Sequence, residues 1–340
     1  MPRATTGAPS WSGSRRCTAA SPEPPEAIAL ALATRIRATV RPLLGDPSSR
    51  FTHGVAHGGD PTFGIDRHAE EVVESALGEL DDVAYFTEDH GLVVRGRPDV
   101  LYLVDPIDGT RPAAAGYETC CATVAVAPYG ESVTLGDVTY GCIAELATGA
   151  TFEATRDRGV HVEGRTVAPT DGKDLRSLFW AGGFRGQPAV PLATVLEGIF
   201  DVPGSQGAFF DQGSAAYSLT RVATGQLDAY VDPGQAMVEA VPGMDEAFRR
   251  VGGGHVLNTT TYDAAASYLL LWEIGLPVTD ALGRSLREVP LLDGDGKASL
   301  VSTVAASTPA LHEEILDEVA RGLDRLRDAQ AERRQRAQSP

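Results

Sequence analysis

Residues 102–116 read YLVDPIDGTRPAAAG and carry an apolar run directly into a pair of acids. The run before Asp105 is typical of a strand that is covered on both faces. Asp105 and Asp108 flank a turn set by Pro106 and can point into one small volume, which is unfavourable unless cations neutralise their charges. Because carboxylates are hard oxygen ligands, and the Ile107 carbonyl is free to join them, the pattern favours Mg²⁺.

Gly109 and Thr110 follow these acids and open the next segment. Backbone amides at such a start can hold a phosphate without a lysine, which suits a chain with a net charge of −17. On its own, an Asp-x-x-Asp-Gly pattern also describes an ordinary surface turn. Three further acids favour the metal interpretation: Glu88 ends the preceding strand, Asp60 lies in a glycine loop before a helix, and Asp263 starts a late helix.

Length and composition limit the classes of protein. The chain has 340 residues, of which 43% are hydrophobic, and this is enough for two subdomains. Its negative charge disfavours nucleic acid and anionic lipid as partners. The four cysteines lack the spacing of a metal site or of a secreted disulfide framework, and no apolar run reaches the roughly 18 residues of a membrane span. We therefore expect a cytoplasmic protein without a membrane segment.

The order of the patterns indicates an α/β architecture. Residues 1–24 are rich in Pro, Ser, Thr and Ala and are predicted to be disordered. Helical spacing over 26–44 and 65–80 is followed by strands in VAYFTED and VLYLVDP, and then by an antiparallel meander over 121–167. A helix and a strand follow in GSAAYSLTRVATGQLDAYVD, and YDAAASYLLLWEIG predicts another helix. Residues 326–340 are predicted to be a charged tail in which a helix frays.

Several segments resemble, in this order along the chain, the signatures of one known family: GGDPTFGIDRHAEEVV, FTEDHG, VDPIDGT, GSAAYSLTRVATGQLDAYVD and YDAAASYLLLWEIGLPVTDALGRSL. This is the inositol monophosphatase family, which belongs with the fructose-1,6-bisphosphatases among the lithium-sensitive, Mg²⁺-dependent phosphatases. The resemblance implies a layered αβαβα sandwich of two subdomains, and a homodimer. We expect an α+β subdomain over 25–170 with most metal ligands, and an α/β subdomain over 171–325 with the substrate-binding residues and the last ligand.

The resemblance also implies which residues hold the metal ions, two or three in number. Glu88, Asp105 and the Ile107 carbonyl would hold one Mg²⁺. Asp105, Asp108 and Asp263 would hold a second, and Glu88 would help to hold a third through water.

The catalytic and substrate-binding residues are implied in the same way. Asp60 and Thr110 would position and deprotonate the attacking water. The amides of Gly109 and Thr110, beside Asp108, would bind the phosphate of a small phosphorylated metabolite. The sugar or polyol would contact two residues of the second subdomain, Ala215 and Asp232. Inositol phosphate, fructose bisphosphate, histidinol phosphate and phosphorylated nucleotides are all possible substrates.

Three features depart from the family pattern. Arg111 stands in RPAAAG, where Asn-Phe is usual shortly after Asp-Gly-Thr, and it either binds a second substrate phosphate or faces solvent. Tyr262 replaces a Trp, which another large amphipathic ring should tolerate. Residues 233–261 form a longer link than is usual, and they either cap the pocket or form a solvated loop with one helical turn.

Two other interpretations compete with a metal-dependent phosphatase. Haloacid-dehalogenase-type phosphatases use an Asp-x-Asp-Gly-Thr motif with a covalent aspartate, and the extra residue between the two acids argues against them here. A catalytically weak metal-binding or regulatory protein that keeps the fold would explain RPAAAG and the long link. The presence of every expected metal ligand argues against that second alternative.

Overall fold

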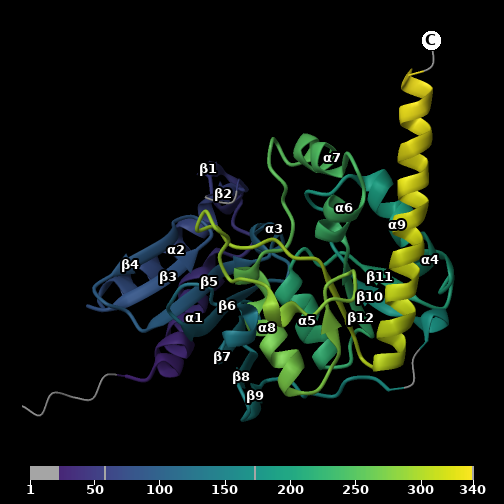
Figure 1. Cartoon of the computed structure of the whole chain (residues 1–340). Helices are drawn as coiled ribbons and strands as arrows, with labels where there is room; N and C mark the ends of the chain where they lie inside the picture. The colour runs from purple at the N-terminus through teal and green to yellow at the C-terminus, as the bar shows by residue number, and fades with distance from the viewer. Residues whose placement is uncertain (1–22, 57–58, 172–173, 339–340) are drawn as a thin grey trace, which may run out of the picture.

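The computed structural model describes residues 23–56, 59–171 and 174–338, and the predicted disorder of 1–24 falls almost wholly outside them. Figure 1 shows a molecule built in layers, with the N-terminal helices at one side and the C-terminal helix at the other. The first layer holds α1 (Pro25–Val40) and α2 (Gly64–Gly78). A short hairpin of β1 (Thr52–Val55) and β2 (Pro61–Phe63) lies between them in sequence.

The second layer is a seven-stranded sheet with the order β4-β3-β5-β6-β7-β8-β9. Its strands β3 and β5 are parallel, and all other neighbours are antiparallel, which includes the predicted meander from β6 to β9. The strands are β3 (Val83–Thr87), β4 (Gly91–Arg95), β5 (Val100–Asp108), β6 (Cys121–Pro128), β7 (Tyr140–Glu145), β8 (Thr151–Thr155) and β9 (Gly159–Glu163). Helix α3 (Thr110–Ala115) follows β5 directly.

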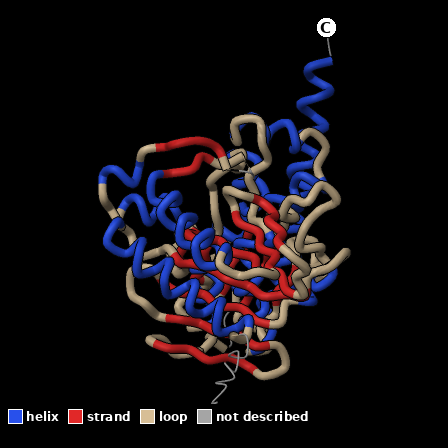
Figure 2. Tube along the Cα trace, turned by 90° about the vertical axis from the view of Figure 1, so that its left-hand side faces the viewer, coloured by secondary structure: helices blue, strands red, loops and turns tan. Residues whose placement is uncertain are grey.

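The third layer consists of α5 (Ala215–Ala223) and α8 (Thr261–Glu273), which lie between the two sheets. The fourth layer is a five-stranded sheet, β11-β10-β12-β14-β13, with parallel pairs on either side of β10 and antiparallel pairs on either side of β14. Figure 2 shows the strands of the sheets stacked with helices between and outside them. The strands are β10 (Phe179–Ala181), β11 (Ala208–Phe210), β12 (Ala229–Asp232), β13 (Val278–Thr279) and β14 (Thr303–Ala306).

The outer layer covers the far face of the five-stranded sheet. It contains α4 (Ala189–Asp201), α6 (Gly234–Ala240), α7 (Met244–Val251) and α9 (Pro309–Gln338). Helix α9 runs past the body of the protein in Figure 1, so the expected charged tail is helical as far as Gln338. The five layers confirm the predicted αβαβα sandwich, and the two large sheets fall on either side of residue 170.

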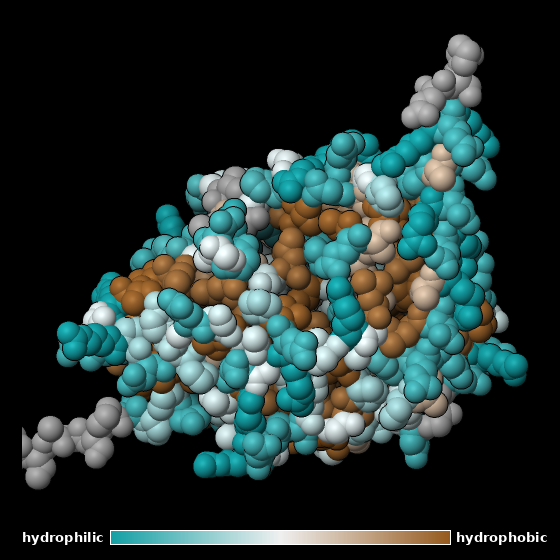
Figure 3. Space-filling model, viewed as in Figure 1, coloured by the Kyte–Doolittle hydropathy of each residue, from teal (hydrophilic) through white to brown (hydrophobic). Residues whose placement is uncertain are grey.

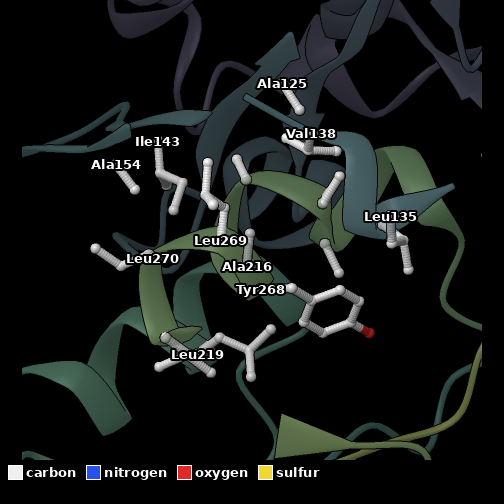
Figure 4. Packing of buried hydrophobic residues seen from close by; sticks show 14 of the residues in the cluster. Ala125, Leu135, Val138, Ile143, Ala154, Ala216, Leu219, Tyr268, Leu269 and Leu270 are labelled. Atoms are coloured by element: carbon white, nitrogen blue, oxygen red, sulfur yellow. The ribbon is translucent and has the colours of Figure 1, made fainter. Parts of the chain in front are cut away.

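Strand β5 is buried on both faces, as its apolar run predicts. Tyr102 and Val104 pack against α1 and α2, whereas Leu101 and Leu103 face the core shared with α5 and α8. The alternation follows from the two-residue period of a strand. Figure 4 shows this second core, where Tyr268 of α8 lies beside helix and sheet residues.

A buried ion pair joins the seven-stranded sheet to the helix layer. Glu145 at the end of β7 is fully buried and accepts a hydrogen bond from Arg221 of α5, whose side chain is 2% exposed. Arg165 also donates to Glu145, at 3.1 and 2.9 Å. Burial alone would raise the pKa of Glu145, but hydrogen bonds from Arg165, Thr148 and Arg221 outweigh it and hold that pKa below its usual value.

Removing one partner of this pair should destabilise the fold. In Arg221→Met, the negative charge of Glu145 stays buried but loses one of its two arginine partners. We expect the unfolding free energy, measured by urea denaturation, to fall by about 3–5 kcal/mol. The matched double variant E145Q/R221M buries no uncompensated charge at this point and should recover most of the loss. A change of less than about 1 kcal/mol in the single variant would contradict this account.

Candidate active site

A cavity of about 1030 Å³ opens between the two subdomains. The space-filling view in Figure 3 shows a hollow with hydrophobic residues at its border, between the β1–β2 hairpin and helices α6 and α7. Acids from both subdomains line the cavity, and all five predicted metal ligands are among its lining residues. These are Glu88, Asp105, Ile107, Asp108 and Asp263, together with the predicted catalytic residues Asp60 and Thr110.

Glu88 and Asp105 are brought together by the parallel pairing of β3 and β5. Thr87 lies opposite Val104 in the register, so the next residue of each strand emerges at the same sheet edge. Burial raises the pKa of both carboxyl groups well above the usual range. Repulsion from Asp263 adds to the shift of Glu88, and repulsion from Asp108 adds to that of Asp105. This confirms the expectation that strand ends would gather acids at one edge.

Asp108 links this edge to the second subdomain. The register between β5 and β6 shifts between Asp105 and Asp108, so that the second acid lies opposite Cys121 at the end of the strand. Its Oδ2 atom accepts hydrogen bonds from the Ser214 hydroxyl at 2.7 Å and from the Ala216 amide, at the start of α5, at 2.6 Å. Burial still raises the pKa of Asp108, because these bonds offset only part of the desolvation cost.

Asp263 approaches the same cavity from the start of α8. It is the third residue of that helix, and its Oδ2 accepts from the Thr260 amide at 2.7 Å in a capping box. Burial raises its pKa to about 7, with repulsion from Asp108 as the second cause. The ring of Tyr262 stacks on Phe86 with centroids 5.5 Å apart, so a tyrosine fills the place next to the ligand.

The donor set fits a hard divalent cation. Asp105 anchors one carboxylate oxygen on the Ile107 amide at 2.9 Å, and Asp108 and Asp263 each anchor Oδ2 on protein donors. Each of these hydrogen bonds falls on a single oxygen of its carboxylate. Among the described residues, no three acidic, histidine or cysteine side chains form a ready-made ligand shell. Mg²⁺ does not require one, because it usually keeps several waters and binds through one or two carboxylates.

Gly109 and Thr110 form the predicted turn beside these acids. Gly109 has a φ of 92°, and a Cβ at this position would come within 2.7 Å of the Thr119 carbonyl oxygen, so only glycine fits. Thr110 begins α3, and its hydroxyl donates to the Ile107 carbonyl at 3.1 Å. The carbonyl predicted as a metal ligand is therefore also an acceptor for the threonine.

Asp66, which the sequence analysis did not select, is the acid that lies next to Thr110. A hydrogen bond with the Thr110 side chain and another from the Phe63 amide lower its pKa, but burial dominates and raises it to about 7. The predicted acid, Asp60, instead pairs with two arginines: Arg111 at 3.2 Å and Arg185. The structure therefore brings Asp60 to the cavity but places a different carboxyl group beside the threonine.

Glu70 is a second buried acid that the sequence analysis did not select. It is 4% exposed, it accepts from the Asp89 amide at 3.4 Å, and burial raises its pKa to about 8. Asp66 and Glu70 are four residues apart on α2 and therefore share a face of the helix. That spacing is the signal that could have found them both.

The two predicted sugar contacts, Ala215 and Asp232, line a smaller cavity of about 80 Å³ next to the large one. Both oxygens of Asp232 are already used. Oδ1 accepts from Gln187 at 2.8 Å and from the Gly234 amide at 2.9 Å, and Oδ2 accepts from Thr259 at 2.7 Å. Asp232 thus fixes the loops around the cavity through both of its carboxylate oxygens.

The long link over 233–261 lines the cavity. It forms α6 and α7, so it contains more helix than the single turn that was one of the two expectations. Six residues at the end of α7 and after it reach the cavity wall: Arg249, His255, Val256, Leu257, Asn258 and Thr260. This agrees with the expectation that the link caps the pocket.

No helix in the described ranges has the length and apolarity that a bilayer crossing needs. Comparison with known proteins gives relatives of which the chain spans different shares. The chain is 27% identical over 305 residues to a fructose-1,6-bisphosphatase/inositol-1-monophosphatase of Methanothermobacter thermautotrophicus, covering 85% of this chain and 94% of that protein. It is 24% identical over 306 residues to a bifunctional NADP phosphatase/NAD kinase of Methanococcus maripaludis, but spans only 48% of that protein.

Solved structures share the fold. The SuhB extragenic suppressor protein of Bartonella henselae aligns with a TM-score of 0.65 at 17% identity, covering 86% of this chain and 97% of that one. A Pyrococcus horikoshii protein described as similar to inositol-1 monophosphatase aligns with a TM-score of 0.62 at 20% identity, covering 86% and 96%. The model of the inositol monophosphatase family matches residues 21–323. The chain therefore belongs to the inositol monophosphatase family.

Proposed function

We propose that this protein is a Mg²⁺-dependent phosphomonoesterase that hydrolyses a small sugar, polyol or related phosphate. One observation carries the proposal: four acids from three separate segments, Glu88, Asp105, Asp108 and Asp263, line one cavity beside the Gly109–Thr110 turn. Relatives that are named as phosphatases support it. The protein would act in the cytoplasm, where its buried and unpaired cysteines Cys120, Cys121 and Cys142 would stay reduced, and as the homodimer that the family resemblance implies.

When bound, Mg²⁺, as two or three ions, would neutralise the acids and the phosphate and would lower the pKa of a bound water. The chain's own residues would do the rest. The first amides of α3, at Gly109 and Thr110, would hold phosphate oxygens. The Thr110 hydroxyl would take a proton from the attacking water and pass its own proton to Asp66. Asp66 suits this role because its pKa of about 7 lies near the working pH of a general base.

Substitution of these residues tests the proposed chemistry. Thr110→Ala and Asp66→Asn should each lower kcat for phosphate release by about 100- to 10,000-fold, because each removes part of the proton path. Asp60→Asn is the matched control, since it changes an acid of the same cavity without touching Thr110, and it should lower kcat by less than about tenfold. An equal loss in Asp60→Asn would return the base role to Asp60. A wild type that releases no phosphate from a broad panel would favour the regulatory alternative.

The proposed metal site predicts how stability depends on pH. The pKa values of Asp66 and Asp263 rise on folding from 3.8 to about 7, so the metal-free folded state binds more protons than the unfolded chain between these values. Metal-free stability should therefore fall as the pH rises from about 4 to about 7. Mg²⁺ binds the ionised carboxylates and should therefore raise Tm more at pH 8 than at pH 6. At 100 times its Kd, the bound ion adds about 2.7 kcal/mol to the unfolding free energy.

The control for this experiment is Asp105→Asn, measured by differential scanning calorimetry with and without Mg²⁺. Removing one buried negative charge should stabilise the metal-free protein and should reduce the shift that Mg²⁺ causes. A Mg²⁺ shift of the same size in wild type and Asp105→Asn would contradict the assignment of Asp105 as a ligand.

A further inference from the structure

Glu88 differs from the other three acids of the cavity in how it is held. The hydrogen bonds that anchor Asp105, Asp108 and Asp263 reach their own carboxylates. Glu88 lies instead in the short turn that joins β3 to β4, just beyond the point where the pairing of these two strands ends. The direction of its side chain therefore depends on how the backbone of this turn is fixed.

Glu70 of α2 is hydrogen-bonded to the residues on both sides of Glu88. Its Oε1 accepts from the Asp89 amide at 3.4 Å, and its carboxyl group also shares a hydrogen bond with the Thr87 side chain. The Thr87 hydroxyl in turn accepts from the His90 amide at 3.2 Å, which closes the turn. The residue before Glu88 and the residue after it are thus tied to one helix.

These contacts lie away from solvent. Glu70 is 4% exposed and Thr87 is fully buried. Burial raises the pKa of Glu70 to about 8, so at pH 7 this carboxyl group is mostly neutral in the metal-free protein. A neutral group adds little charge to a metal site, so the contribution of Glu70 lies in the hydrogen bonds that it makes.

Helix α2 connects this turn to the proposed base. Asp66, the proposed proton acceptor, lies one turn before Glu70 on the same helix. Glu70 therefore joins the element that carries the base to the turn that carries the metal ligand Glu88. Asp89 extends this connection, because its Oδ1 accepts from the Thr62 hydroxyl of β2 at 2.8 Å.

Two neighbouring acids of α2 lie in different surroundings. Glu71 is 62% exposed and pairs with Arg67 of its own helix at 3.8 Å. Glu74 is 53% exposed and lies 3.4 Å from Nε2 of His90, a residue whose side chain is also at the surface. The same Nε2 lies 3.7 Å from Oε2 of Glu70, which is beyond hydrogen-bond distance. Of these three acids, Glu70 is the one buried against the turn.

We infer that Glu70 is a positioning residue for the metal site: it holds the Thr87–Asp89 segment so that the Glu88 carboxylate faces the cavity where Mg²⁺ would bind. The inference rests on the proposed function and adds a residue that touches neither substrate nor metal. Hydrogen-bond partners behind metal ligands typically contribute about 10- to 100-fold to metal affinity. Glu70 should contribute through its acceptor oxygen and not through its charge.

Calorimetric titration of the full chain with Mg²⁺ at pH 7, without substrate, tests this inference. Glu70→Leu removes the acceptor and should raise Kd for Mg²⁺ by about 10- to 100-fold. Glu70→Gln keeps an acceptor oxygen and the shape of the side chain, so its Kd should stay within about threefold of the wild-type value. Glu71→Leu makes the same change at an exposed position of α2 and is the control, which should leave Kd unchanged.

A double-mutant cycle with Glu88→Gln shows whether Glu70 acts through Glu88. If it does, Glu70→Leu should weaken Mg²⁺ binding far less in the Glu88→Gln background than in the wild type. A general loss of packing would instead weaken binding by the same factor in both backgrounds. Thr87→Val removes a hydroxyl contact of Glu70 and leaves Glu70 itself in place. It should raise Kd severalfold, and it keeps the test decisive if Glu70→Leu does not fold.

The outcomes separate this inference from the proposed function. Equal Kd values in the wild type, Glu70→Leu and Thr87→Val would overturn the inference and leave the phosphatase proposal standing. A loss that Glu70→Gln shares in full, or that persists unchanged in the Glu88→Gln background, would also overturn it. A wild type that binds no Mg²⁺ would overturn both. Cooperative thermal unfolding of each metal-free variant shows that a lower affinity does not come from misfolding.

Discussion

The cost of burying several carboxyl groups in one cavity is the constraint on which the rest of this structure depends. Glu88, Asp105, Asp108 and Asp263 all have pKa values raised by burial, and repulsion within the set adds to three of these shifts. A chain selected for stability alone would not place them together. Their convergence is favourable only if cations bind among them. The open cavity that these acids line gives cations access.

The fold lowers this cost by anchoring three of the four acids through a single oxygen each. Three different backbone devices do so: a tight turn at Asp105, a register shift and a helix start at Asp108, and a capping box at Asp263. Each device fixes the direction of the carboxylate without using up both oxygens. The site is therefore preorganised by ordinary secondary structure, since strand ends and helix starts are where such donors are left free.

The sequence was sufficient to predict those parts of the site that depend on periodic patterns. The apolar run before Asp105 and the parallel strand before Glu88 place two acids at one edge, and the structure has them there. The choice between Asp60 and Asp66 depends on where a loop ends and α2 begins. The four-residue spacing of Asp66 and Glu70 indicates that they share a helix face, but it does not say that this face lies toward Thr110. Arg185 could not be predicted either, because its partner Asp60 lies 125 residues away in another subdomain.

The long link over 233–261 shows a similar limit to prediction from sequence. Its glycines and acids are compatible with either a loop or helices, and only the packing of Met244 and Phe248 against the second sheet's outer core decides in favour of α7. Burial of apolar side chains by a tertiary partner outweighs weak local preference in such a segment. The same packing carries Arg249 and the residues after it to the cavity wall.

The ion pair between Glu145 and Arg221 has a consequence for how the two halves of the molecule move. Both partners are rigidly packed, and α5, which carries Arg221, also holds Asp108 at its first turn. On the open side of the cavity, by contrast, the halves are tied by Asp60 and Arg185, of which the arginine is 47% exposed. A motion that separates the two halves would therefore break the exposed Asp60–Arg185 pair more easily than the buried Glu145–Arg221 pair. The entrance of the cavity would widen, and a ligand could enter while the acids near the buried pair keep their spacing.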